Sequence, residues 1–205
     1  MALFDANNVV RYKLSGGVWT DDGGAGNGYT LSVNGAVGQI AGHSGESNTA
    51  AELVVNDDIS DAPKNLYRAD NASLSVTGAM TIAGWVYAKA STTYPTQGSC
   101  IASKSMNTSN QRGFILYRDG TDGKLKLYIS SDGTSTSVVT ASSTGTVAQG
   151  QWVHCCGVYD GTDVRVYING TQDGTPAAWT AGIKDNTAAF RIGLYNSVDA
   201  AVYGY

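Results

Sequence analysis

The chain has 205 residues and a formal net charge of −4, and only 15% of its residues are charged. Glycine, serine, threonine and asparagine together supply 78 residues, whereas a long amphipathic helix needs a charged face, so an all-helical protein is excluded. Twelve tyrosines and four tryptophans exclude a disordered chain. The sequence has no basic cluster that could neutralise phosphates, so we expect no nucleic-acid partner. An all-β domain with many turns fits this composition.

The sequence has no run of 18 apolar residues, so we expect no membrane insertion. Residues 1–8 show neither the basic nor the apolar region of a signal peptide. The location therefore stays unknown at this point, with an extracellular or virion-associated setting as our hypothesis.

The predicted elements begin in a glycine-rich segment, residues 1–70, where Val9–Leu14, Tyr29–Val33 and Thr49–Val55 are expected to be strands. From residue 73 to 194 the pattern is one of strands separated by turns. The strands predicted there are Ser73–Thr77, Met80–Tyr87, Cys100–Lys104, Gly113–Arg118, Lys124–Ser130, Ser137–Ala141, Trp152–Tyr159, Asp163–Asn169 and Phe190–Leu194.

Two features give these strands their arrangement. Leu125, Leu127 and Ile129 alternate with polar or amphipathic residues, which predicts one buried face. Asp-Gly and Asn-Gly pairs such as Asp160-Gly161 and Asn169-Gly170 supply the positive φ angles of tight hairpins. We therefore predict an antiparallel β-sandwich, with Met80–Tyr87 in a central position because both of its faces are apolar.

Large and reactive side chains are interpreted first as structural. Trp85 and Trp152 lie inside predicted strands, so we expect them in the core, with His154 on the same side as Trp152. The three cysteines form no CxxC pair, and neighbours 155 and 156 would point to opposite faces of a strand. We therefore expect Cys100, Cys155 and Cys156 to be unpaired and mostly buried.

Five segments in order resemble the concanavalin A-like, laminin-G-type jelly roll. They are Thr81–Val86 (TIAGWV), Ile101–Lys104 (IASK), Gly113–Tyr117 (GFILY), Gln151–Thr162 (QWVHCCGVYDGT) and Val166–Gly170 (VYING). The resemblance implies a single domain over residues 1–205 with two curved antiparallel sheets. It also implies that ligands meet loops or a concave sheet face.

The same superfamily includes glucanases, which hydrolyse glycosidic bonds with a pair of carboxylates. Here the only glutamates are Glu46 and Glu52, and no E-x-D-x-x-E strand is present. We therefore predict no enzymatic activity, and a glycoside hydrolase relative is the least favoured alternative.

A binding module for carbohydrate or a cell-surface glycan is the leading functional hypothesis. Exposed loop aromatics can stack on sugar rings while nearby amides bind hydroxyls, and the candidates are Tyr94, Trp179, Tyr195 and Asn196. Loop anchoring is the structural alternative for each of them. The other function class is a structural or assembly domain, either a decoration of a phage virion or a pentraxin-like homo-oligomer.

No cofactor is certain from the sequence, and calcium is left open. Some relatives hold Ca²⁺ with oxygens from two neighbouring loops, and calcium prefers six to eight oxygen ligands. The candidate ligands are Asp70, Asn71, Asn110 and Asp199, although Arg112 would oppose a cation beside Asn110.

The end of the sequence carries one further expectation. In the family, a closing strand follows the segment that matches Phe190–Gly193, and residues 200–205 reach only the start of such a strand. The resemblance therefore implies a sandwich whose closing C-terminal strand is missing from this chain. We favour a chain cut short from a longer one; the alternatives are a strand supplied by a neighbouring chain and a shift of Leu3–Leu14 to cover the gap.

Overall fold

The computed structural model describes residues 12–15, 18–21, 30–35, 37–45, 47, 49–53, 64–89 and 98–194. Its strands are β1 (Tyr12–Ser15), β2 (Val18–Asp21), β3 (Ser32–Asn34), β4 (Gly38–Ile40), β5 (Ala50–Glu52), β6 (Asn65–Arg68), β7 (Met80–Tyr87), β8 (Ser99–Met106), β9 (Gln111–Arg118), β10 (Lys124–Ser130), β11 (Val138–Thr146), β12 (Trp152–Tyr159), β13 (Asp163–Ile168), β14 (Thr171–Gln172), β15 (Ala177–Ala178) and β16 (Phe190–Ile192). The helical element among these residues is one short 3₁₀ turn, η1 (Ala72–Leu74).

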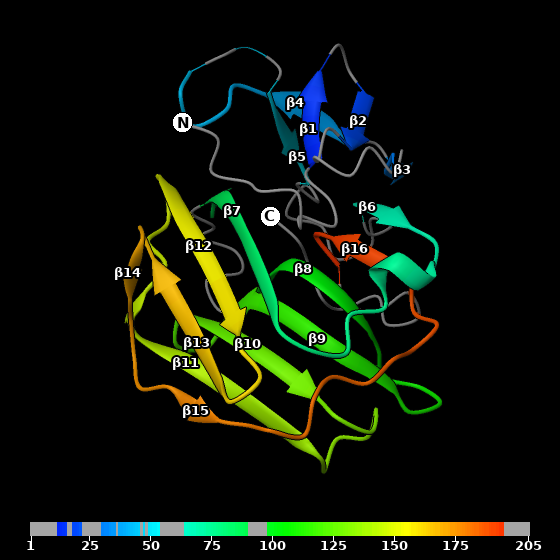
Figure 1. Ribbon diagram of the computed structural model, residues 1–205. Coiled ribbons are helices and arrows are strands. Elements are labelled where there is room, and N and C mark those ends of the chain that lie inside the picture. Colours follow the sequence, from blue (N-terminus) through cyan, green and yellow to red (C-terminus); the bar gives the residue numbers. More distant parts are fainter. Residues whose placement is uncertain are drawn as a thin grey trace.

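Two antiparallel sheets form the body of the molecule. The larger has seven strands in the order β11-β10-β9-β8-β16-β6-β3, and the smaller has the order β14-β13-β12-β7, with β15 pairing to β13. In Figure 1 the smaller sheet lies in front of β8–β11, and the short β1–β2 and β4–β5 pairs lie at the top. The predicted all-β, antiparallel jelly-roll sandwich is confirmed.

The core lies between the two sheets and follows the alternation in the sequence. Leu125, Leu127 and Ile129 of β10 are fully buried, as predicted, and they belong to one cluster with Val153 of β12 and Val164 of β13. Each such side chain contributes about 1.5–3 kcal/mol on burial. Because inward and outward residues alternate, the same strands place every second side chain on an outer face.

The prediction that Trp85 and Trp152 lie in the core is wrong. Met80, Ile82 and Val86 occupy the inward positions of β7, so the alternation turns Trp85 outward, where it is 47% exposed. Trp152 is half-buried on the outer face of β12, on the same side as His154. In the described sheet β7 is also the last strand rather than a central one.

Two further differences concern the stretch before β7. Ser73–Thr77 is not a strand, because the side chain of Asn71 accepts a hydrogen bond from the Ser73 amide and begins η1 there. β6 was not predicted, although it pairs with both β3 and β16. Its first residue, Asn65, is a fully buried amide, and such a residue masks the apolar pattern of a strand.

The cysteines are unpaired, as predicted. Cys100 and Cys155 are buried and Cys156 is half-buried. Burial raises the thiol pKa to about 12 for both Cys100 and Cys155. These thiols therefore stay protonated at neutral pH and are poor nucleophiles.

Two other expectations concern membrane insertion and the closing strand. Within them, no helix is long and apolar enough to cross a membrane. The missing closing strand concerns residues 200–205, which lie outside the described residues, so it stays a prediction.

Candidate functional site

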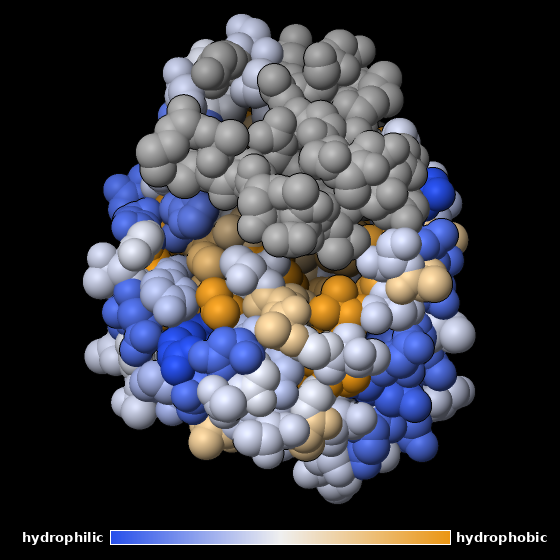
Figure 2. Space-filling view, in the orientation of Figure 1, coloured by the Kyte–Doolittle hydropathy of each residue, from blue (hydrophilic) through white to orange (hydrophobic). Residues whose placement is uncertain are grey.

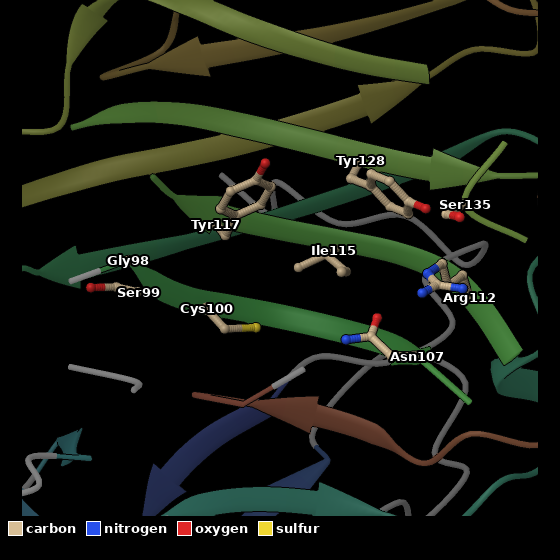
Figure 3. A pocket seen from close by; sticks show the side chains of 9 residues that line it. All are labelled: Gly98, Ser99, Cys100, Asn107, Arg112, Ile115, Tyr117, Tyr128 and Ser135. Atoms are coloured by element: carbon tan, nitrogen blue, oxygen red, sulfur yellow. The ribbon is translucent and has the colours of Figure 1, made fainter. Parts of the chain in front are cut away.

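A groove of about 320 Å³ lies on the outer face of the seven-stranded sheet. This volume is within the range of pockets that bind small ligands, roughly 300–1,000 Å³. Its lining comes from β8, β9, β10 and the turns beside them: Gly98, Ser99, Cys100, Asn107, Arg112, Ile115, Tyr117, Tyr128 and Ser135. Figure 3 shows the residues of this lining on and beside the three strands.

The strand register brings the apolar part of the groove together. Tyr128 of β10 pairs with Ile115 of β9, and Tyr117 of β9 pairs with Cys100 of β8. Directly paired residues on one face have their Cβ atoms about 4.5–5.5 Å apart. Tyr128 therefore lies beside Ile115 on the neighbouring strand, and Tyr117 lies two residues further along β9 on the same face; Figure 3 shows all three side chains in the groove.

Polar groups gather at one end of this groove. Figure 3 places Arg112, Asn107 and Ser135 around the hydroxyl end of Tyr128, whereas Tyr117 and Cys100 lie toward the other end. Asn107 and Arg112 flank the β8–β9 turn, and Ser135 belongs to the β10–β11 turn. The groove therefore combines an apolar floor with hydrogen-bonding groups that come from two turns.

The two turns are held against each other by backbone contacts. The Arg112 amide donates to the carbonyl oxygen of Gly133, with 3.2 Å between nitrogen and oxygen. Gly133 has a φ of +88°, and a Cβ atom at this position would overlap the carbonyl of Asn110. A side chain at residue 133 would push the two turns apart, so glycine fixes the polar end of the groove.

A second set of bonds stiffens the β10–β11 turn itself. The Asp132 carboxylate accepts from the Thr134 amide at 2.8 Å and from the Ser137 hydroxyl at 2.7 Å. These bonds lower the pKa of Asp132 to about 2, with the Ser137 bond as the largest cause. The carboxylate is thus ionised at neutral pH and is occupied within its own turn.

The electrostatics differ between the two ends of this sheet face. Lys126, the strand partner of Tyr117, is ion-paired with Asp119 at 2.8 Å and Asp122 at 3.1 Å. In contrast, within the described ranges no carboxylate lies within ion-pair distance of the Arg112 guanidinium.

Tyr128 is affected by both its burial and its charged neighbours. Its phenol pKa lies above the ordinary value, chiefly because burial disfavours the phenolate, while the positive charge of Arg112 acts in the opposite direction. The hydroxyl therefore remains protonated at neutral pH and can both donate and accept a hydrogen bond.

One polar group in the lining has no partner of its own. Ser99 is 2% exposed, and its hydroxyl makes no hydrogen bond among the described residues. A buried hydroxyl without a partner costs about 1–3 kcal/mol. The strand register pairs Ser99 with the buried Arg118 and Cys100 with Tyr117, so the Ser99 hydroxyl lies on the other face of β8 from the two groove residues.

The structure does not gather the predicted ligand-binding residues into this site. Tyr94, Tyr195 and Asn196 lie outside the described residues, although Gly98, four positions after Tyr94, lines the groove. Trp179 packs partly against the main core, and its indole N–H donates to the Gly182 carbonyl at 2.8 Å. That bond corresponds to the loop-anchoring alternative.

The predicted calcium ligands are likewise dispersed. The Asp70 carboxylate forms an ion pair with the buried ammonium of Lys104 at 2.8 Å, and the Asn71 side chain caps η1. Asn110 lies in the β8–β9 turn, and Asp199 is outside the described residues. The described members do not fit a calcium site as placed, since their one carboxylate is already paired, and calcium stays a prediction. No group of three or more His, Cys, Asp or Glu side chains suited to a metal occurs in the described part of the chain.

A second exposed feature is an aromatic row on the outer face of β7 and β12. Trp85 stacks on His43 with ring centroids 3.8 Å apart and meets His154 edge-on at 5.3 Å. Tyr87, 37% exposed, contacts Trp152 in the same edge-on way. Figure 2 views the molecule from this side; the apolar residues that it shows near the centre are not the aromatic row, because tryptophan, tyrosine and histidine lie on the hydrophilic half of its scale. His43 stacks on one face of Trp85, so that face is already covered.

The groove was missed at the sequence level, although one signal was present. The alternation already separates Tyr128 from Leu127 and Ile129 and assigns it to the outer face. Which outward residues become neighbours depends on the register between strands, and Tyr117 and Ile115 enter the groove only through that register.

Comparisons with known proteins agree with this architecture. The family model described as "Concanavalin A-like lectin/glucanases superfamily" matches residues 60–205. No curated protein matches the sequence.

Solved structures share the fold at low sequence identity. The botulinum neurotoxin serotype G binding domain matches with a TM-score of 0.65 and 14% identity, over 95% of this chain and 45% of that one. Domain 4 of AbnA, a GH43 extracellular arabinanase from Geobacillus stearothermophilus in complex with arabinotriose, matches with a TM-score of 0.60 and 21% identity, over 90% and 82% of the two chains. The binding domain of Paraclostridial Mosquitocidal Protein 1 gives a TM-score of 0.62 and 13% identity, over 94% and 49%. This chain thus spans less than half the length of the two toxin domains.

Proposed function

The chain belongs to the concanavalin A-like lectin/glucanases superfamily, and from this premise we propose that it is a non-catalytic carbohydrate-binding module with its ligand in the groove of β8, β9 and β10. The observation that carries the proposal is the pairing of two outward tyrosines with a cluster of polar side chains at one end. Sugars present both apolar C–H faces and hydroxyl groups. A site with rings beside hydrogen-bonding groups matches both features.

The chemistry of the lining supports binding rather than hydrolysis. Hydrolysis of a glycosidic bond uses two carboxylates on either side of the bond. The described lining instead offers phenols, hydroxyls, an amide and a guanidinium. Glu52, one of only two glutamates in the chain, pairs with Lys89 on another part of the molecule.

A domain of the same fold has been solved in complex with arabinotriose, so oligosaccharides are the first ligands to screen. We propose binding of purified protein to a panel of neutral and acidic oligosaccharides, measured by isothermal titration calorimetry. Tyr117→Ala and Tyr128→Ala should each weaken the binding of any ligand found by about tenfold, which corresponds to about 1.4 kcal/mol.

Tyr167→Ala is the matched control, because Tyr167 is a half-buried tyrosine on the outer face of β13 in the other sheet. The affinity of Tyr167→Ala for the oligosaccharide should equal that of the unmodified protein. Equal loss in all three variants, or loss in Tyr167→Ala alone, would contradict the placement of the ligand in the groove.

The assembly alternative is favoured by a different observation, the exposed aromatic row at Trp85 and Tyr87. An exposed apolar patch can mark a protein–protein contact. If no oligosaccharide binds and sedimentation shows a stable homo-oligomer that Trp85→Ala dissociates, the module serves assembly instead. A virion or cell-surface setting is part of either proposal.

A further inference from the structure

The polar end of the groove carries a guanidinium that has no ion-pair partner among the described residues. Arg112 is the second residue of β9, close to the β8–β9 turn, and lines the groove with Asn107 and Ser135. In the parts of the chain that the structure describes, the charged heads of Lys104, Lys126 and Arg165 have carboxylate partners within 4 Å, and that of Arg112 has none. The chain as a whole has a net negative charge, so a positively charged group at this end of the groove differs from the overall charge of the protein.

A negative charge also acts at this end of the groove, and it belongs to Asp132. Its effect on Tyr128 opposes that of Arg112, so both charges act on the same end of the groove. The oxygens of Asp132 are nevertheless occupied by the Thr134 amide and hydroxyl and by the Ser137 hydroxyl. Asp132 therefore stabilises its turn and leaves the donors of Arg112 available to a ligand.

A guanidinium is suited to one class of sugar substituent. Its planar N–H groups match the two oxygens of a carboxylate and can bind it through two parallel hydrogen bonds. Hydrogen bonds to a charged group contribute about 1.5–3 kcal/mol, roughly twice those between neutral groups. The neutral donors beside it, on Asn107 and Ser135, can bind further oxygens of the same ligand.

We infer that the groove selects an acidic glycan, with a uronic-acid carboxylate at Arg112 and the apolar face of the sugar against Tyr117, Ile115 and Tyr128. This inference rests on the proposed function, since it identifies the ligand class of the same site. The separation of the polar end from the apolar floor orients the sugar, because the one cation of the described lining, Arg112, lies at one end of the groove.

The test compares a matched pair of probes, tri-galacturonic acid and its uncharged counterpart galactotriose, by calorimetry at low and high salt. The unmodified protein should bind the acidic trisaccharide at least about tenfold tighter at low salt, and high salt should reduce that preference. Arg112→Gln should remove the preference, because it should weaken the binding of tri-galacturonic acid much more than that of galactotriose. Arg112→Lys should keep only part of the preference, because a point charge cannot bind both oxygens in the same plane.

Lys124→Gln is the control for the change in net charge. Lys124 lies on β10, on the same face as Tyr128 but outside the groove lining, so its loss should change the preference less than twofold. A sulfated galactan trisaccharide serves as the third probe. If it binds tighter than tri-galacturonic acid, the choice of a carboxylate is overturned.

The failures of the two proposals are distinguishable. Equal binding of both trisaccharides, or a preference that survives Arg112→Gln, overturns the acidic ligand. If Tyr117→Ala and Tyr128→Ala still weaken binding about tenfold in that case, the groove remains a carbohydrate site. If no probe binds the unmodified protein, both the acidic ligand and the proposed function are overturned.

Discussion

Lys104 is a buried cation that connects distant segments of the chain. It is 2% exposed, and its ammonium group lies between the Asp70 carboxylate at 2.8 Å and the Asn186 side-chain oxygen at 3.3 Å, with the Asn186 carbonyl as a further acceptor. These partners lie in the segment before η1 and in the segment that precedes β16. One cation on β8 therefore joins two stretches that are distant in the sequence.

Lys104→Met should lower the free energy of unfolding by about 2–3 kcal/mol. Removal of one member of a buried pair costs about 3–5 kcal/mol, and the lower figure applies because the Asp70 carboxylate is about one-third exposed and can be hydrated. The measurement is urea-induced unfolding at pH 7. Lys124→Met, at a half-buried position on β10, should change stability by less than about 0.5 kcal/mol. Equal effects of the two variants would show that the buried contacts contribute little.

Among the elements, the β10–β11 turn has the clearest consequence for the groove. Gly133 combines a φ of +88° with a backbone contact that leaves no room for a Cβ atom. The neighbouring β8–β9 turn depends on this contact, because the Arg112 amide bonds to the Gly133 carbonyl.

Gly133→Ala should therefore destabilise the protein and weaken ligand binding together. The left-handed backbone alone costs about 1–2 kcal/mol with a side chain, and the overlap with Asn110 adds to it. Gly161→Ala is the matched control, since Gly161 also has positive φ but a Cβ atom there would meet no neighbour. Thermal unfolding and calorimetry should show that Gly161→Ala loses stability without losing affinity. If Gly133→Ala bound the ligand with full affinity, the turn would not be needed to form the binding site.

Elements with one buried face could be predicted from the sequence, because period-two alternation reports burial directly. The predicted bounds of β7, β10 and β12 agree with those observed. The alternation does not say which face of an apolar strand is inside, so Trp85 was assigned to the wrong side. The groove required the pairing of β8, β9 and β10, and that register arises from contacts across the whole sandwich rather than from local sequence.

At the scale of the whole molecule, carboxylates in the turns link stability to pH. Hydrogen bonds and charge from Lys126 lower the pKa of Asp119, Arg165 does the same for Asp160, and the Ser137 bond lowers the pKa of Asp132 to about 2. A carboxyl group with a lowered folded-state pKa stabilises the fold above its unfolded pKa of about 4 and loses that effect as the pH falls through the folded value.

The melting temperature should consequently be nearly constant from pH 7 to 5 and should fall between about pH 4 and pH 2. Asp160→Asn should lower the melting temperature at pH 7 but make it less dependent on pH in the acidic range, since one of these groups no longer titrates. Circular dichroism melts at pH 7, 5, 4, 3 and 2 measure both effects. A melting temperature that does not change down to pH 2 would contradict the role of these turn carboxylates.

The most direct measurement is a crystal structure of the protein in complex with an oligosaccharide that binds in solution. The account predicts electron density for a sugar in the groove of the seven-stranded sheet, with its ring against Tyr117 and Tyr128 and its polar substituents toward Arg112 and Asn107. Density for the sugar on the aromatic row at Trp85, or at any other surface with the groove empty, would contradict it.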